Sequence, residues 1–466
     1  MNSQDVDNDI RLYIDRRLKL DKTLSMLSES LKEEVRNSVL SKSNGMFRYA
    51  QCEMDHLASQ RIGRGVPRAL SDMPSNLNET YKRTLENIRN TEDRRVIKRA
   101  SLWLAYSLRP LKLQELADAV VVEEDDDAID DDIRLHDPTI LLEYANGLFE
   151  FNPVTQAVSL SHSSIKTFLT SDWIKNSSVS YFALGWDTEC HLKIMRWCLT
   201  YLSYSEFNSG CRAISKSTVS RYPFLGYAAW NWPYHLRNPS AKDWELVSAF
   251  LSTRNSESAG NYGCWMHVLN GSMHPETLKK TQPLYYTASF GFSPLVEAML
   301  LFDDSLDLEE PGGRAGSTAL QVACFRRQKE VTQILIEAGA DFLSRHGSFP
   351  NRKGITSLWW AETNGWVDLV ALMTSIMTQK KIRVVPEDPY PIQYIQEVQK
   401  ADARQIMHIM EGGQTELLDK KLVATEVPRR YLSKSKMERF LERRFGKGNF
   451  IIDILVRYIL SGIIQI

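Results

Sequence analysis

Hydrophobic residues recur every three to four positions along much of the chain, which predicts a mainly α-helical fold. Near the N-terminus, Ile10, Ile14 and Leu18 fall on one face of a predicted helix. The pattern changes around Asn152 and Pro153, where the apolar segments 148–151 and 157–160 predict a β-hairpin. A helical chain with one small hairpin is therefore expected.

Self-similarity is the strongest pattern in the C-terminal half. Three segments each contain a Leu that is followed within four residues by an Ala, and these are Leu284, Leu320 and Leu358, in steps of 36 and 38 residues. The segments resemble the T-P-L-H-x-A opening of ankyrin repeats, with Tyr285, Gln321 and Trp359 in place of His.

The second half of each segment supports the same resemblance. Residues 330–341 resemble the second helix of an ankyrin repeat, with Val331, Ile334 and Leu335 on one face and Gly339 at its end. The resemblance implies a solenoid of about three repeats over residues 281–378. Such a stack binds proteins and would do so here through its concave face and the tips 308–314 and 345–352.

The N-terminal half carries a second set of motifs. Gly45–Ala50, Pro67–Leu70 and Leu77–Arg83 resemble the segment that closes the NACHT domain of fungal STAND signalling proteins. The resemblance implies that residues 1–62 are the last helices of a NACHT-like domain. It also implies self-association through this region and a cytoplasmic location.

Further blocks follow in the order that these fungal proteins show. Residues 103–107 and 109–117 resemble the winged-helix domain of GPI inositol-deacylase type, which implies such a domain over 63–175. Blocks at 191–203 and 222–229 resemble the helical connector that precedes the ankyrin array, here 176–280. We expect a cluster of aromatic residues in and after the second block to form the core of this connector: Tyr222, Phe224, Tyr227, Trp230, Trp232 and Tyr234. Residues 379–466 are predicted to be a linker and C-terminal helices, including a basic helix over 434–444.

Composition narrows the possible partners. The 57 Lys and Arg residues balance 58 Asp and Glu residues, so no nucleic acid is expected as a partner. The acidic residues within 123–132 would repel phosphates, and we expect them to form a solvated loop. Asp453 and Arg457 interrupt the apolar tail, so no membrane span is predicted. The six scattered Cys residues are interpreted as reduced core thiols.

No motif of a catalytic or metal site occurs in the sequence. We find no G-x-x-x-x-G-K-[ST] phosphate loop, no G-x-S-x-G nucleophile elbow, no H-E-x-x-H and no C-x-x-C. We therefore predict that the chain is not an enzyme and has no catalytic residue, no metal site and no cofactor of its own.

His162 is the one candidate cofactor-binding residue. It follows the second strand of the predicted hairpin, where related switch proteins carry the His of an M-H-D motif that contacts the β-phosphate of ADP. Here Ser161 and Ser163 replace Met and Asp. His162 is therefore interpreted as a structural histidine, with the alternative that it senses nucleotide when an NTPase core is supplied.

The patterns together predict a non-catalytic protein-binding chain of the ankyrin and NACHT signalling class, with fungal non-self recognition as the role that the resemblance implies. One alternative is a part of an ATP-dependent NOD-like receptor whose phosphate loop lies upstream. Another is a winged-helix regulator associated with DNA.

Overall fold

The computed structural model is mainly helical, as the hydrophobic period predicts. Its contacts divide the chain into two compact units, Met1–Val121 with Arg134–Cys190, and Val122–Ile133 with His191–Ile466. The structure describes residues 3–60, 65–129, 132–145, 147–210, 216–255, 259–269, 280–303, 306–313, 316–345, 348–349, 352–353 and 355–382. The predicted tail helices lie outside these ranges.

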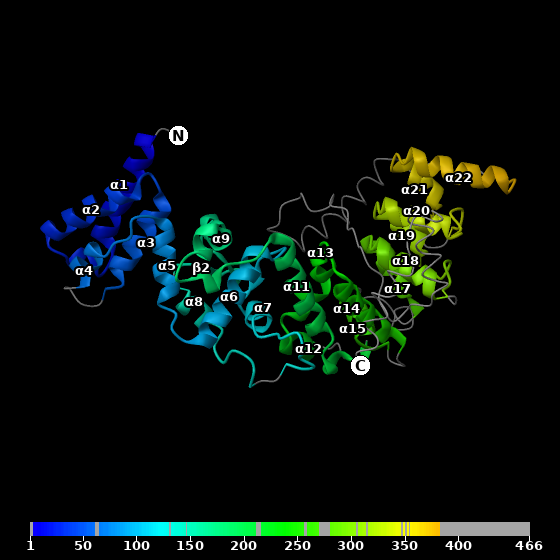
Figure 1. Ribbon diagram of the computed structural model, residues 1–466, viewed down its shortest axis with the longest axis horizontal. Helices are drawn as coiled ribbons and strands as arrows, with labels where there is room; N and C mark the ends of the chain where they lie inside the picture. The colour runs from blue at the N-terminus through cyan, green and yellow to red at the C-terminus, as the bar shows by residue number, and fades with distance from the viewer. Residues whose placement is uncertain are drawn as a thin grey trace. The chain divides into compact units, whose positions relative to one another are not determined.

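The first unit begins with helices that surround one apolar core (Figure 1). These elements are α1 (Ser3–Leu20), the 3₁₀ turn η1 (Leu24–Met26), α2 (Glu29–Ser43), α3 (Phe47–Ala58) and α4 (Gly65–Ser71). Ile10, Ile14 and Leu18 are all buried in this core, so the predicted stripe is confirmed. Asn44 and Gly45 have positive φ angles, which end α2 and turn the chain into α3.

The rest of the first unit combines helices with a small antiparallel sheet. Its helices are α5 (Leu77–Glu86), α6 (Thr91–Tyr106), α7 (Leu113–Ala119), α8 (Ile140–Tyr144), α9 (Ser163–Thr170), α10 (Asp172–Lys175) and the 3₁₀ turn η2 (Ser180–Phe182). Its strands are β1 (Leu111–Lys112), β2 (Phe149–Asn152) and β3 (Ala157–Leu160), in the spatial order β1-β3-β2.

The predicted hairpin is present as β2 and β3, with Phe151 opposite Val158. Its turn forms because the Asn152 side chain accepts hydrogen bonds from the backbone N–H groups of Val154 (2.9 Å) and Thr155 (3.1 Å). Strand β1 was not predicted. It is only two residues long and is a strand because Leu111 pairs with Val158, a partner 47 positions later in the chain (158 minus 111).

The second unit opens with an aromatic helical region. Its elements are α11 (Asp187–Leu202, in this unit from His191), η3 (Ser205–Phe207), α12 (Lys216–Arg221), α13 (Leu225–His235), α14 (Ala241–Ser252), η5 (Thr253–Asn255) and α15 (Gly260–Leu269). Phe224, Tyr227 and Trp232 are fully buried, and the Trp232 ring lies 5.3 Å from that of Trp265. Tyr222 is also buried, whereas Trp230 and Tyr234 are half-buried, so four residues of the expected cluster are core.

The acidic segment 122–133 belongs to this unit and is anchored by its backbone. The carbonyl of Asp127 accepts a hydrogen bond from the backbone N–H of Ser205 (2.8 Å), and that of Glu124 accepts one from the Thr200 hydroxyl (3.4 Å). Ile129 is buried, whereas the side chains of Glu124, Asp125 and Asp127 are exposed. These three carboxylates are thus solvated, while the backbone at Glu124 and Asp127 is fixed by hydrogen bonds.

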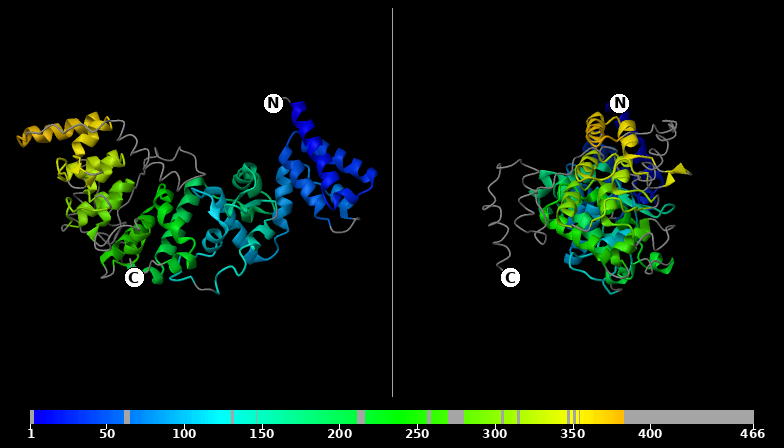
Figure 2. Two further views of the ribbon diagram at one scale, coloured as in Figure 1. Left: turned by 180° about the vertical axis from the view of Figure 1, so that it is seen from behind. Right: turned by 90° about the vertical axis from the view of Figure 1, so that its right-hand side faces the viewer.

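Helix pairs occupy the three predicted repeat segments (Figures 1 and 2). The pairs are α17 (Pro283–Phe290) with α18 (Ser293–Phe302), α19 (Ala319–Phe325) with α20 (Lys329–Glu337), and α21 (Ser357–Thr363) with α22 (Val367–Gln379). Leu284, Leu320 and Leu358 are buried in one shared core. In the third segment, β4 (Ser348–Phe349) and β5 (Arg352–Lys353) form a two-stranded tip.

Polar side chains join successive pairs. The Gln328 amide donates to the carbonyl of Ser289 (3.3 Å), and the Asn364 amide donates to that of Cys324 (2.8 Å). These two bonds tie the second pair to the first and the third pair to the second.

The aromatic region and the first helix pair share a continuous core. The Trp265 ring lies 5.5 Å from that of Tyr286, and the Trp232 ring lies 5.9 Å from that of Phe292. The aromatic region therefore covers the first helix pair, at the N-terminal end of the described stack.

Two glycines make room for Tyr285, one of the residues that replace the expected His. A Cβ atom at Gly313 would lie 2.3 Å from the Tyr285 hydroxyl oxygen, and one at Gly312 would lie 2.9 Å from its ring. Gly313 also has a φ of +64°, in the left-handed region that favours glycine. The ring of Tyr285 therefore fits only against a glycine turn.

We predict that Gly313→Ala lowers the free energy of unfolding of the repeat segment by about 1–3 kcal/mol, from backbone strain and the clash with Tyr285. Gly316→Ala is the matched control, because Gly316 has a φ of +62° but open space where a Cβ atom would lie. Urea unfolding followed by tryptophan fluorescence measures both. Equal losses of unfolding free energy in the two variants would show that a Cβ atom at position 313 does not clash with Tyr285.

Candidate functional site

His162 lies at the exposed start of α9 and caps it. Its Nδ1 atom accepts a hydrogen bond from the backbone N–H of Ser164 (3.2 Å) and lies 2.7 Å from the Ser164 hydroxyl oxygen. An Nδ1 atom that accepts carries no proton, so the neutral ring bears its proton on Nε2. This geometry is that of a helix cap. It also leaves a donor on the far side of an exposed imidazole ring.

Ser164 connects His162 to α5. The hydroxyl groups of Tyr81 and Ser164 are 2.8 Å apart, and Tyr81 is itself buried against Phe168 of α9. Burial raises the pKa of the Tyr81 hydroxyl, with hydrogen bonding to Ser164 and Arg48 opposing it. Tyr81 therefore remains a neutral hydroxyl that positions the Ser164 hydroxyl next to Nδ1 of His162.

Arg48 connects the other side of His162 to α3. Its Nη2 atom donates to the Ser161 hydroxyl (2.7 Å) and to the carbonyl of Gly147. Ser161 in turn donates to the same carbonyl (2.7 Å). The structure thus joins the G-M-F-R motif to the residue before His162, although the two are 113 positions apart. Neither contact was predicted.

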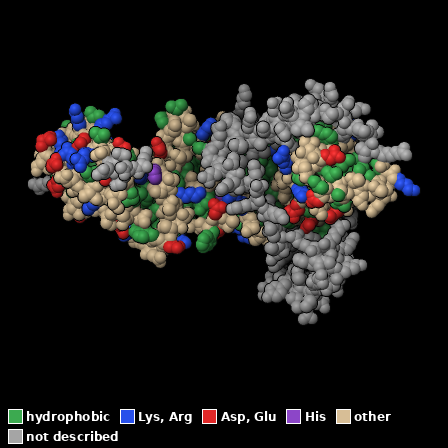
Figure 3. Space-filling view, turned by 90° about the horizontal axis from the view of Figure 1, so that it is seen from above, with side chains coloured by type: hydrophobic (Ala, Val, Ile, Leu, Met, Phe, Trp, Pro, Cys, Tyr) green, Lys and Arg blue, Asp and Glu red, His purple; other side chains and the backbone are tan. Residues whose placement is uncertain are grey.

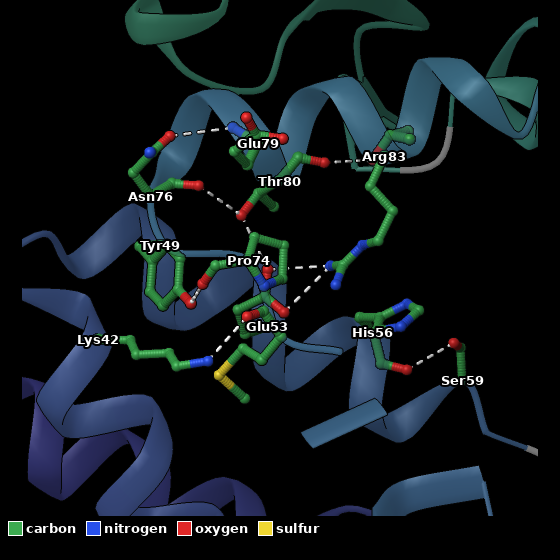
Figure 4. Close-up of polar contacts among 12 residues, drawn as sticks. Lys42, Tyr49, Glu53, His56, Ser59, Pro74, Asn76, Glu79, Thr80 and Arg83 are labelled. Carbon is green, nitrogen blue, oxygen red and sulfur yellow. Dashed lines mark hydrogen bonds and ion pairs between the residues drawn. The ribbon is translucent and has the colours of Figure 1, made fainter. Parts of the chain in front are cut away.

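An ion pair between the buried Glu53 and the half-buried Arg83 lies in the same region, between α3 and α5 (Figure 4). Glu53 is fully buried and accepts hydrogen bonds from Nη2 of Arg83 at 2.9 and 3.1 Å, and from the Thr80 hydroxyl at 2.9 Å. Burial raises the pKa of the Glu53 carboxyl group, while Arg83 and Thr80 act to lower it. The carboxylate therefore has its partners within the protein.

Neighbouring contacts hold the turn between α4 and α5 against this pair. The Tyr49 hydroxyl donates to the carbonyl of Pro74, as Figure 4 shows. The Lys42 ammonium group donates to the carbonyl of Met73 (2.8 Å). Asn76 caps α5 by accepting from the backbone N–H of Glu79 (3.1 Å). These bonds fix where α5 meets Glu53.

The pair of Glu53 and Arg83 was not predicted. The available signal was that Glu53 lies on the apolar face of α3, beside Tyr49, Ala50 and Leu57, all of which are buried. A carboxylate on a buried face requires a partner, since an unpaired buried charge is very costly. The sequence could not name Arg83, because the partner depends on how α5 crosses α3.

The polar residues of this region have little reactive chemistry of their own. Burial raises the pKa of the Cys52 thiol to about 11, so the nucleophilic thiolate is scarce at neutral pH. The Glu53 carboxylate is occupied by Arg83 and Thr80. Within the described residues, no group of three His, Cys, Asp or Glu residues is placed to hold a metal ion.

The predicted tips of the repeat segments are partly described. In the first, the backbone N–H of Gly312 donates to the carbonyl of Ser317 (2.9 Å), which closes a narrow turn. Glu309 accepts from the backbone N–H of Asp341 (2.7 Å) and so links this tip to the next helix pair. Arg345 is exposed at the second tip. Residues 314–315, 346–347, 350–351 and 354 lie outside the described ranges.

The predictions for membrane spans and thiols can be compared with the structure. Along the part of the chain that the structure describes, no helix is both long and apolar enough to cross a membrane. The thiols of Cys190, Cys198, Cys264 and Cys324 are reduced and buried, and that of Cys52 is reduced and half-buried. Cys211 lies outside the described residues.

We predict that Arg83→Met destabilises the first unit by about 3–5 kcal/mol, because it leaves the Glu53 carboxylate buried without its counter-charge. Glu53→Gln should cost less, since Arg83 keeps 23% of its side chain exposed to water. The double variant should recover much of the loss. Urea unfolding of all three proteins tests the coupling, and additive losses in the double variant would contradict it.

The pH dependence of Arg83→Met follows from the same pair. The positive charge of Arg83 is the largest of the effects that lower the pKa of Glu53 against the effect of burial. Without Arg83, the pKa of Glu53 in the folded state therefore lies further above its unfolded value. The stability of the variant relative to the unsubstituted protein should therefore rise as pH falls from about 7 to about 5. If the stability difference between Arg83→Met and the unsubstituted protein stays constant over this pH range, Glu53 does not take up a proton within it.

Comparison with known proteins gives no assignment for this chain. No model of a known protein family matches it, and no solved structure matches it. The resemblance to NACHT, winged-helix and ankyrin proteins therefore remains a prediction from its motifs.

Proposed function

We propose that this chain is a non-catalytic, cytoplasmic protein-binding molecule of the ankyrin and NACHT signalling class, with its partner on the stacked helix pairs of residues 281–378. The observation that carries the proposal is that side-chain hydrogen bonds from Gln328 and Asn364 connect successive helix pairs, which also share one apolar core. Side-chain bonds of this kind fix neighbouring pairs in register, so the exposed residues between them form a pre-organised surface.

The first helix of the second pair, α19, supports this surface through Gln321. Gln321 replaces the His of the ankyrin motif and bonds within the stack, donating to the carbonyls of Ser344 (2.8 Å) and Ile355 (3.3 Å). Glu362 and Arg327 are exposed on neighbouring pairs of the same stack. A partner would therefore meet charged side chains on a fixed backbone, which is the arrangement that gives electrostatic specificity.

A nucleotide-switched receptor is the second candidate, favoured by the exposed imidazole of His162 at the start of α9. It would require an NTPase core that contacts this histidine. A DNA-associated regulator has less support. On the face that Figure 3 shows, the N-terminal helices carry Lys and Arg side chains interspersed with Asp and Glu, and such a mixture does not form a phosphate-binding field.

We predict that Glu362→Lys weakens binding of the partner protein at least about 10-fold, since it reverses a charge on the proposed surface. Glu34→Lys, the same charge reversal at an exposed glutamate on α2, should leave binding unchanged. Proteins that co-purify with the intact chain would be identified by mass spectrometry, and their affinities for both variants compared. Equal affinities of the two variants would show that the partner does not bind at α21.

The two candidate functions differ in nucleotide binding. We expect that the isolated chain does not bind Mg-ADP with a Kd below about 1 mM, because its sequence contains no phosphate loop. Isothermal titration calorimetry of the full chain measures this. Micromolar binding that is lost in His162→Ala would overturn the proposal in favour of the nucleotide-switched receptor.

A further inference from the structure

Two buried histidines meet between α11 and α13. His191 is 4% exposed and His235 is fully buried, and their Nδ1 atoms lie 2.7 Å apart. The Tyr227 hydroxyl lies 2.9 Å from Nε2 of His235. The three side chains thus form one hydrogen-bonded chain across the junction of the two helices, in a region rich in packed aromatic rings.

The distance between the two Nδ1 atoms requires one shared proton when both rings are neutral. One nitrogen must donate and the other must accept, because two facing lone pairs or two facing N–H groups would repel at 2.7 Å. Tyr227 fits either arrangement, since its hydroxyl can donate to His235 or accept from it. The neutral pair is therefore satisfied, whereas a doubly protonated pair would lose this bond.

The surrounding charges also oppose protonation. Burial lowers the pKa of His235 well below its ordinary value, and His191 and the guanidinium of Arg237 lower it further. The neighbouring helix α14 carries one carboxylate, that of Asp243, and it is paired with Arg196 of α11 at 2.7 Å. Burial opposes the charge of Asp243, yet Arg196 and Ser240 hold its pKa below the usual range, so it remains ionised and paired.

We propose that His191, His235 and Tyr227 form a proton-sensitive latch that docks α11 on α13, and that mild acidification releases it. Release would loosen the aromatic region that covers the first helix pair, because Trp232 of α13 contacts Phe292 in that pair. The ion pair of Arg196 with Asp243 is a second polar contact of α11, and the lowered pKa of Asp243 keeps its carboxylate charged over the same pH range. The latch is independent of the proposed protein-binding function.

The sign of the effect follows from proton linkage. The unfolded or released segment binds a proton on His235 near pH 6.5, whereas the docked segment does not, so acid favours release. The stability that the latch contributes is fully present above this pH and falls below it. The equilibrium constant for release should rise up to about 10-fold for each pH unit below that value, for each proton taken up.

Hydrogen–deuterium exchange on the full chain tests the latch directly. Peptides from α11 should lose protection by about 5-fold between about pH 6.5 and about pH 5.5, after correction for intrinsic exchange chemistry, because one proton is taken up by a group that is half protonated at the upper pH. His235→Asn keeps a polar group in place but does not titrate, and should reduce the fall to less than about 2-fold. His136→Asn, at an exposed histidine, should retain the full fall. Equal pH dependence in the two variants would overturn the proposal.

A second measurement stands if His235→Asn does not fold. Ring ¹⁵N spectra of the histidine-labelled chain report the protonation of its nine histidines. We expect that the His235 ring does not titrate near pH 6.5 and that a downfield proton is shared between the Nδ1 atoms of His191 and His235. If all nine histidine rings titrate near pH 6.5, the hydrogen bond between His191 and His235 is not formed in solution.

Discussion

Short helices that cannot bury their apolar faces alone set the main constraint on the second unit. Helices α17, α19 and α21 have eight, seven and seven residues, well below the roughly 12–15 residues at which an isolated helix becomes marginally stable. Each exists because its neighbours cover it, as the shared core around Leu320 and Ala323 shows. The aromatic region through Trp232 and Trp265 supplies the same cover at one end of the stack.

Buried polar groups act on a different level, by deciding which packing is adopted. Glu53 can be buried only where Arg83 and Thr80 reach it, and His191 only where His235 faces it. Such pairs add little net stability compared with apolar side chains of the same size. They do penalise every arrangement that separates the partners. In this chain they occur where α3 meets α5 and where α11 meets α13, so they fix the helix crossings.

The candidate site around His162 shows how one histidine can support two interpretations. Its Nδ1 atom caps α9, which is a structural role that needs no ligand. Its neighbours, Ser161 and Ser164, are fixed by Arg48 and Tyr81 from two other helices. The ring is thereby held in one orientation at the surface, which is the requirement for a sensor as well as the result of capping. The chemistry of the imidazole alone does not separate these roles.

The sequence by itself determined the local elements of this protein. Period and turn residues placed the stripe of Ile10, Ile14 and Leu18, the hairpin around Asn152, and a helix pair at each of the three repeat segments, because these depend on residues close together in the chain. Only the tertiary structure decided the partners across long separations. Strand β1, the contact of Arg48 with Ser161, and the pairing of His191 with His235 all join residues more than 40 positions apart. Such contacts depend on how helices cross, and no local pattern of hydrophobic residues encodes that geometry.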